Sequence, residues 1–116
     1  MILLPWPLKL LNPNARNHWG AHARAKKAYR AACAWAAKSQ GVVRLGPGKI
    51  TVSLIFVPPD QRRRDLDNMI ASMKSGLDGL ADALGVDDNR FRLTAELATC
   101  GRIGGYVEVS ISQDAA

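Results

Sequence analysis

The chain contains little cysteine, no long apolar run and almost no acidic residues in its first half. Its two cysteines, Cys33 and Cys100, are too few for a disulfide framework and lie in no metal-binding spacing, so both are expected to be reduced, buried thiols. No stretch approaches the roughly 20 apolar residues that span a bilayer, and the N-terminus lacks a basic secretory leader. The sequence therefore predicts a soluble, cytoplasmic protein with no membrane partner.

A length of 116 residues suits one domain with a substantial core and is too short for two. The chain has no internal repeat, no low-complexity tract and no linker that would mark a boundary. Residues 1–116 are therefore expected to form a single domain.

The sign of the charge changes near the middle of the chain. Before Asp65 there are twelve lysines and arginines and the single acid Asp60, whereas from Asp65 onward nine acids face four bases, which leaves a net charge of +6. A basic protein suggests an anionic partner, although composition alone does not separate nucleic acid from an acidic membrane. The change of sign predicts a phosphate-binding surface beside a cation site, against the alternative of ordinary surface charge.

The first half of the chain predicts two strands and one helix. A short strand is expected at residues 2–5, followed by an irregular arm that contains prolines and runs to about residue 21. The alanine-rich segment 21–39 lacks glycine and proline and favours a basic helix. Apolar residues alternate over 49–57, which predicts a strand that ends at Pro58-Pro59.

The second half predicts one long helix and two strands. An apolar stripe indicates a continuous helix over 66–84 that ends at Gly85, with Asp67 and Lys74 on one flank about 10 Å apart. Strands near 93–100 and 106–112 are expected to pair as a terminal hairpin. The order of elements predicts an α/β or α+β fold, with a small mixed sheet packed by two main helices. The stripe, expected in the core, consists of Leu66, Met69, Ile70, Met73, Leu77, Leu80 and Leu84.

The run Arg62-Arg63-Arg64-Asp65-Leu66-Asp67-Asn68 places phosphate-seeking charge directly beside metal-seeking charge. Guanidinium groups hold phosphates through forked hydrogen bonds, and carboxylates two residues apart can hold a hard divalent cation. Lys74 and the pair Asp87-Asp88 follow later in the chain. Taken singly, Asp65 could be an N-terminal helix charge and Asp87-Asp88 a polar turn. Together with the arginines, these residues predict a nuclease.

The chain resembles the RusA family of Holliday junction resolvases, which are crossover junction endodeoxyribonucleases, over nearly its whole length. The resemblance is carried by Leu4-Pro5-Trp6-Pro7, Ala28-Tyr29-Arg30, Arg64-Asp65-Leu66-Asp67-Asn68, Lys74, Leu77-Asp78-Gly79-Leu80 and Asp87-Asp88. It implies a C2 homodimer of small endonuclease subunits that resolves four-way DNA junctions by paired symmetric nicks, in DNA recombination and repair. A bacterial or a phage origin is compatible with it.

The resemblance also implies the roles of individual residues. Asp65, Asp67 and Asp88 correspond to the catalytic carboxylates that bind Mg²⁺, for which Mn²⁺ is a possible substitute, and no small-molecule cofactor is expected. Lys74 corresponds to the active-site lysine. Many members of the family place that lysine four residues after the second aspartate, where this chain has Ala71, so the match to Lys74 requires an insertion of three residues.

The DNA-binding surface is expected to centre on Arg62, Arg63 and Arg64, with Arg16 and Lys27 extending it. His18 and His22 are interpreted as DNA contacts or surface residues, because no third zinc ligand is evident. Two alternatives stay open on the sequence alone. A nuclease acting on flaps or other branched DNA would share every catalytic residue, and a DNA-binding module without catalysis would also be basic.

Overall fold

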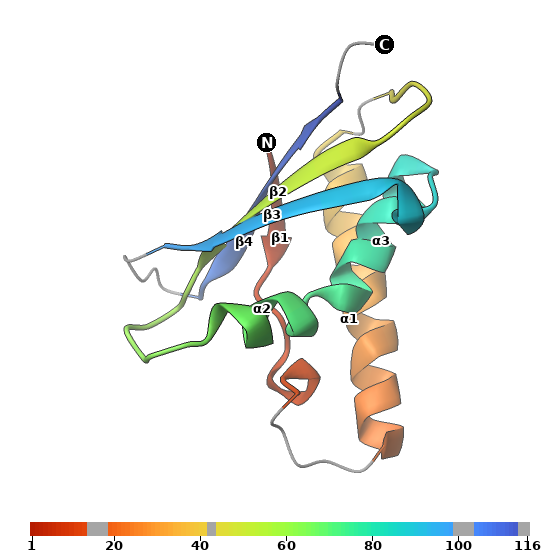
Figure 1. The fold of residues 1–116 in the computed structure, drawn as a ribbon. Coiled ribbons are helices and arrows are strands. Elements are labelled where there is room, and N and C mark those ends of the chain that lie inside the picture. The colour runs from red at the N-terminus through yellow and green to blue at the C-terminus, as the bar shows by residue number, and fades with distance from the viewer. Residues whose placement is uncertain (14–18, 42–43, 99–103, 114–116) are drawn as a thin grey trace.

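A mixed four-stranded sheet with helices on one face forms the fold, in a computed structural model that describes residues 1–13, 19–41, 44–98 and 104–113 (Figure 1). The strands are β1 (Ile2–Pro5), β2 (Ile50–Val57), β3 (Phe91–Leu97) and β4 (Tyr106–Ser112). The helices are α1 (Trp19–Ser39), α2 (Leu66–Ser72) and α3 (Lys74–Leu84), with short 3-10 helices η1 (Lys9–Leu11) and η2 (Asp88–Arg90). The predicted α+β class and mixed sheet are confirmed.

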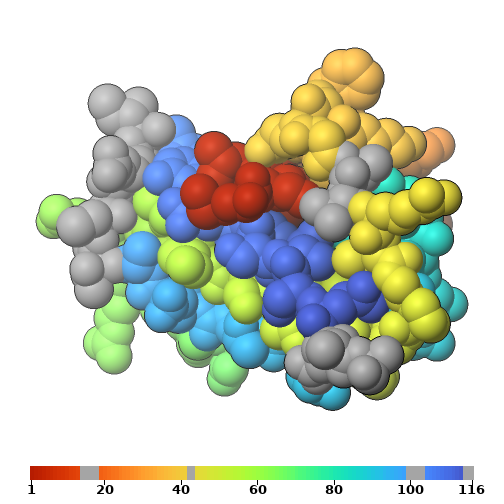
Figure 2. Space-filling view, turned by 90° about the horizontal axis from the view of Figure 1, so that it is seen from above, coloured from red at the N-terminus to blue at the C-terminus, as the bar shows by residue number. Residues whose placement is uncertain are grey.

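The strand order is β1-β4-β2-β3, so the predicted terminal hairpin is wrong. β4 pairs antiparallel with both β1 and β2, whereas β3 pairs in parallel with β2. Figure 2 shows β1 in red lying beside β4 in dark blue. The reason for the error is the crossover: α2 and α3 carry the chain back along the sheet, so β3 must start beside the start of β2. β4 then fills the other side of β2.

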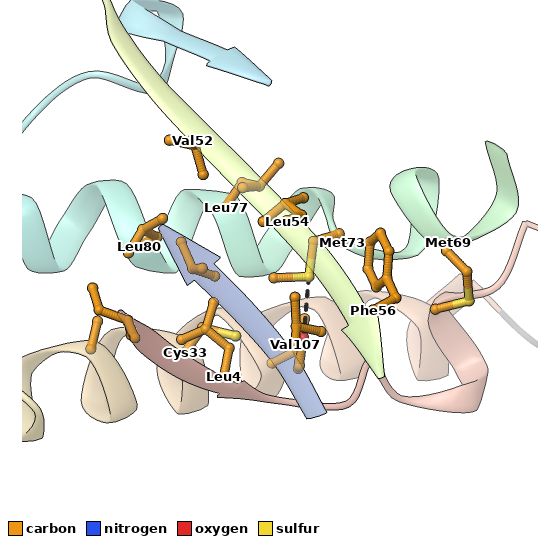
Figure 3. Close-up of a cluster of buried hydrophobic side chains, with 14 of the residues drawn as sticks. Leu4, Cys33, Val52, Leu54, Phe56, Met69, Met73, Leu77, Leu80 and Val107 are labelled. Carbon is orange, nitrogen blue, oxygen red and sulfur yellow. Dashed lines mark hydrogen bonds between the residues drawn. The ribbon is translucent and has the colours of Figure 1, made fainter. Parts of the chain in front are cut away.

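One face of the sheet carries the core. β2 buries Ile50, Val52, Leu54 and Phe56 on that face, against α1 and α3 (Figure 3). The side chain of Cys33 on α1 is fully buried, as predicted, and burial raises the pKa of its thiol to about 11. Cys33 is therefore an unreactive core residue. Cys100 lies outside the described residues.

The helix predicted over 66–84 is broken at Met73, where the backbone N–H bonds the carbonyl of Ile70 at 3.1 Å in a tightened turn. Next to the break, the hydroxyl of Ser72 donates a hydrogen bond to the carbonyl of Asn68 at 2.8 Å, a local contact that bends helices. Met73 is fully buried, and its sulfur lies 3.4 Å from the hydroxyl of Tyr29. Most of the predicted apolar stripe is still in or against the core.

α1 and α3 approach each other very closely at Gly79. A β-carbon added there would lie 2.2 Å from the carbonyl oxygen of Arg30, a backbone atom of α1. Glycine is therefore required at position 79 by the packing of the two helices. None of the helices in the described part of the chain is long and apolar enough to cross a membrane.

Candidate functional site

The loop after β2 presents Asp65 and Asp67 at the start of α2. Asp65 is the N-cap of this helix, and its carboxylate accepts a hydrogen bond from the backbone N–H of Asp67 at 3.0 Å. Both aspartates are exposed. Asp65 therefore has the helix-capping role that the sequence left open. Because both side chains are exposed, each carboxylate keeps at least one oxygen available to a cation.

Arg64 has a different environment from the two arginines before it. Its guanidinium pairs with the carboxylate of Asp60 at 2.9 Å and donates hydrogen bonds to the carbonyls of Asp60 and Arg62 at 3.2 and 3.1 Å. It also lies over the ring of Trp6, 5.3 Å from the ring centre. With its side chain only 16% exposed, Arg64 holds the loop to the N-terminal arm and is poorly placed as a direct phosphate contact.

Arg62 and Arg63 remain as the exposed cations of the triplet. The side chain of Arg62 is 77% exposed and lies 3.7 Å from Asp60 at its nearest approach, which is a weak contact. Arg63 is exposed and forms no ion pair within the described residues. Backbone and arginine contacts lower the pKa of Asp60, chiefly through the N–H of Arg62, so this carboxylate stays ionised and offsets part of the positive charge.

A second acidic group lies before β3. Asp87 caps η2 by accepting a hydrogen bond from the N–H of Asn89 at 3.0 Å, and Asp88 begins that turn. The pKa of Asp88 is raised by a hydrogen-bonded contact with the carboxyl of Asp78, then by Asp87 and by desolvation. Close carboxyl groups favour a shared proton or a bound cation. Asp78 on α3 is thus a neighbour of Asp88 and the main cause of its raised pKa.

The two acidic groups lie at opposite ends of β2 within one chain. β3 pairs with β2 in parallel from Ile50↔Phe91 to Phe56↔Leu97, so Asp88 lies near the start of β2 while Asp65 follows its end. Figure 1 shows α2 near one end of the sheet and the turn before β3 at the other. In the part of the chain that is described, no three His, Cys, Asp or Glu side chains are grouped as a metal site. The predicted set of Asp65, Asp67 and Asp88 does not converge in a single chain.

Lys74 is the first residue of α3, immediately after the break at Met73, and it is exposed. The prediction that Lys74 shares a flank with Asp67 assumed one continuous helix. The break at Met73 interrupts that helix, so the assumption does not hold. Lys27 is exposed on α1. Arg16 and His18 lie outside the described residues.

Several residues that carry the family resemblance are structural. The hydroxyl of Tyr29 donates a hydrogen bond to the carbonyl of Pro5 at 2.6 Å, and burial raises the pKa of Tyr29 far above its usual value, so the hydroxyl stays protonated. Arg30 forms a two-pronged ion pair with Asp82 at 2.7 and 2.9 Å. Sequence reasoning did not find this pair, because its two residues lie 52 positions apart.

A cavity of about 970 Å³ lies between the N-terminal arm and the Arg62–Asp65 loop with α2. Its lining includes Trp6, Lys9, Arg64, Asp65 and Asn68. Trp6 is fixed there by an edge-on contact with Phe56, with ring centres 6.3 Å apart. Trp6 thus packs against the core, whereas the tryptophans on α1, Trp19 and Trp35, are 79% and 74% exposed. The cavity could not be predicted from the sequence, because its walls come from segments about 50 residues apart.

No protein-family model matches this chain. A protein of Xylella fastidiosa (strain Temecula1 / ATCC 700964), described as an uncharacterized protein, is 42% identical to it over 114 residues. The alignment covers 96% of this chain and 74% of the relative.

Proposed function

This chain belongs to the same protein family as the Xylella fastidiosa protein, and we propose that it is a metal-dependent endodeoxyribonuclease that cuts four-way DNA junctions. The proposal rests on one juxtaposition. The exposed residues Arg62 and Arg63 lie on the loop that leads into α2. Asp65 and Asp67, which are also exposed, follow them at the start of that helix. Cationic side chains that hold a phosphate, next to carboxylates that hold a cation, are the parts that phosphodiester hydrolysis requires.

The residues of one chain do not fit a three-carboxylate Mg²⁺ site, because Asp88 lies at the far end of β2 from Asp65 and Asp67. Each end supplies only half of the donors: Asp65 with Asp67 at one, and Asp88 with Asp78 at the other. Bound Mg²⁺ would neutralise charge at the phosphate and activate water. The site that the family resemblance implies therefore needs a second copy of the chain.

A two-fold dimer across β3 satisfies this need. β3 is the last strand of the sheet, and within the described residues only β2 pairs with it as a strand. If two copies joined antiparallel along β3, the start of β3 in one copy would lie beside the end of β3 in the other. Asp88 of one copy would then face the end of the sheet that carries Asp65 and Asp67 of the other.

The remaining side chains have separable tasks in this proposal. Arg62 and Arg63 hold the backbone of the strand that is cut, and Arg64 keeps their loop in place through Asp60 and Trp6. Lys74 is the exposed cation nearest in sequence to α2, and it stabilises charge that develops on the phosphate. A dimer with two such sites suits a substrate that is itself close to two-fold symmetric.

The test is cleavage of a labelled synthetic four-way junction beside a flap and a linear duplex, with Mg²⁺, Mn²⁺ or EDTA. We expect symmetric nicking of the junction alone, dependent on metal and abolished in Asp67→Asn. Asp82→Asn is the matched control, because it removes a carboxylate that pairs with Arg30 outside the proposed site. Equal cutting of the flap would make the protein a general branched-DNA nuclease. Junction binding without cutting in every metal would make it a non-catalytic DNA-binding module.

A further inference from the structure

The cavity beside Asp65 has a wall and a polar group that the proposed cleavage reaction does not use, and its rim adds Lys9 to Arg62 and Arg63. One wall contains the ring of Trp6, with the guanidinium of Arg64 over it at 5.3 Å from the ring centre. Both side chains are held in place: Trp6 packs on the fully buried Phe56, and Arg64 is fixed by an ion pair and two carbonyl contacts. Aromatic rings and guanidinium groups are the surfaces on which an unstacked nucleic-acid base stacks.

The rim of the cavity is positively charged. Lys9, Arg62 and Arg63 line it and are exposed, and of these only Arg62 forms an ion pair within the described residues, at 3.7 Å. Asp60 is an acidic residue of the same lining, and its carboxylate already forms an ion pair with Arg64 at 2.9 Å. An anionic ligand with a planar part therefore matches the rim and the wall together.

The polar group is the carboxamide of Asn68. Asn68 is half-buried and lines the cavity, and its side chain makes no hydrogen bond within the described residues. A free carboxamide offers a donor and an acceptor side by side, the arrangement that reads the edge of a base. Asn68 also follows Asp67 directly, so whatever it binds lies next to the proposed site of cleavage.

We propose that this cavity holds one unstacked nucleotide of the DNA strand next to the phosphodiester that is cut, and that Asn68 reads its base. The inference rests on the proposed nuclease function and adds the source of a cutting preference. A volume of about 970 Å³ accommodates one nucleotide but not a duplex. Strands at the centre of a branched DNA molecule bend sharply, and the cost of unstacking a base is least where pairing is already lost.

The experiment uses a four-way junction with 2-aminopurine at the crossover, bound by the full chain in EDTA so that nothing is cut. The fluorescence of this base rises when it leaves the stack. We expect a rise on binding that is lost in Asn68→Ala and kept in Gln61→Ala, which removes an amide from the same loop outside the cavity lining. Thermal melting shows whether each variant is folded, and Asn68→Asp, which keeps the shape but loses the donor, is a second variant.

A separate readout is the choice of cutting position among junctions that differ in the base at the crossover. We expect Asn68→Ala to reduce the discrimination between the best and worst base by about tenfold, and Asn68→Asp to change which base is preferred. No rise in fluorescence, or a rise that both folded Asn68 variants retain, would overturn the inference even if metal-dependent cleavage is normal. A rise that depends on Asn68 in a protein that cuts no DNA would support the cavity and refute the nuclease.

Discussion

Mixing two inactive variants gives the sharpest test of a site shared between two copies. Seven paired residues separate the two ends of β2 and β3, which at about 3.3 Å per residue amounts to roughly 20 Å. Mg²⁺ requires its oxygen ligands at about 2.1 Å. The parallel register keeps Asp88 near the start of β2, whereas Asp65 and Asp67 follow its end, so we expect the three carboxylates to meet only across two copies.

The perturbation is a pair of carboxylate-to-amide substitutions, Asp67→Asn in one preparation and Asp88→Asn in another. Each alone should be inactive. In a mixed dimer with shared sites, both substitutions fall in one site and the other site is intact. With free exchange of subunits half of the dimers are mixed, so the mixture should recover about a quarter of the wild-type sites.

The assay is nicking of the synthetic junction, with exchange followed by native mass spectrometry of differently tagged chains. The mixed dimer should nick one strand per binding event and not two. Asp65→Asn mixed with Asp67→Asn is the control, since every site of that mixture is damaged and no activity should return. If exchange is complete and Asp67→Asn with Asp88→Asn stays inactive, the shared site is refuted.

Three further predictions concern the scaffold. Gly79→Ala should destabilise the fold by about 1–3 kcal/mol or more, because its β-carbon would lie 2.2 Å from the Arg30 carbonyl, whereas Gly46→Ala, with its nearest atom at 3.8 Å, should be close to neutral in urea unfolding. Tyr29→Phe should cost about 1–2 kcal/mol in the same measurement, since the carbonyl of Pro5 loses its 2.6 Å partner; an unchanged midpoint would contradict the bond. Arg30 lowers the pKa of Asp82, so this pair stabilises the fold above the ordinary carboxyl pKa and the gain is lost as the pH falls through the lower folded value. Asp82→Asn should therefore lower the melting temperature at pH 7, and this effect should vanish once the pH falls below the lowered pKa of Asp82; an equal loss at neutral and at strongly acidic pH would rule out the ion pair as the cause.

The sequence predicted the elements of the fold better than their arrangement. The alternation of Ile50, Val52, Leu54 and Phe56 fixed β2 and its buried face, because a period of two depends on local residues alone. The pairing of the last strands depends on where the crossover returns the chain, and short apolar segments do not encode this. Two strands that are neighbours in sequence were therefore expected to pair, while β2 in fact lies between them.

The candidate site was predictable in its chemistry and not in its geometry. Residue types and spacing identified the carboxylates and arginines, but the three arginines looked equivalent in the sequence. Arg64 differs only because Trp6 and Asp60 are brought to it by the fold. The same holds for Asp78, whose contact with Asp88 joins a helix to a turn ten residues later.

The resemblance to the RusA family implies an insertion of three residues between Asp67 and Lys74. The break at Met73 lies within this segment. A continuous helix would fix the angle between the side chains of Asp67 and Lys74 about the helix axis, whereas a break changes that angle. Lys74 stays a prediction, and activity measurements on Lys74→Ala beside Lys74→Arg are the direct way to examine it.

The break at Met73 also divides the local stability of the molecule. α2 has seven residues, too few for a helix to persist by itself, and it is secured by the Asp65 cap and the buried Met69. α3 is anchored over its whole length against α1. Backbone amides of α2 should therefore exchange with solvent faster than those of α3, through openings that leave the core intact. Asp67 therefore lies on a segment that can open without unfolding the rest of the molecule.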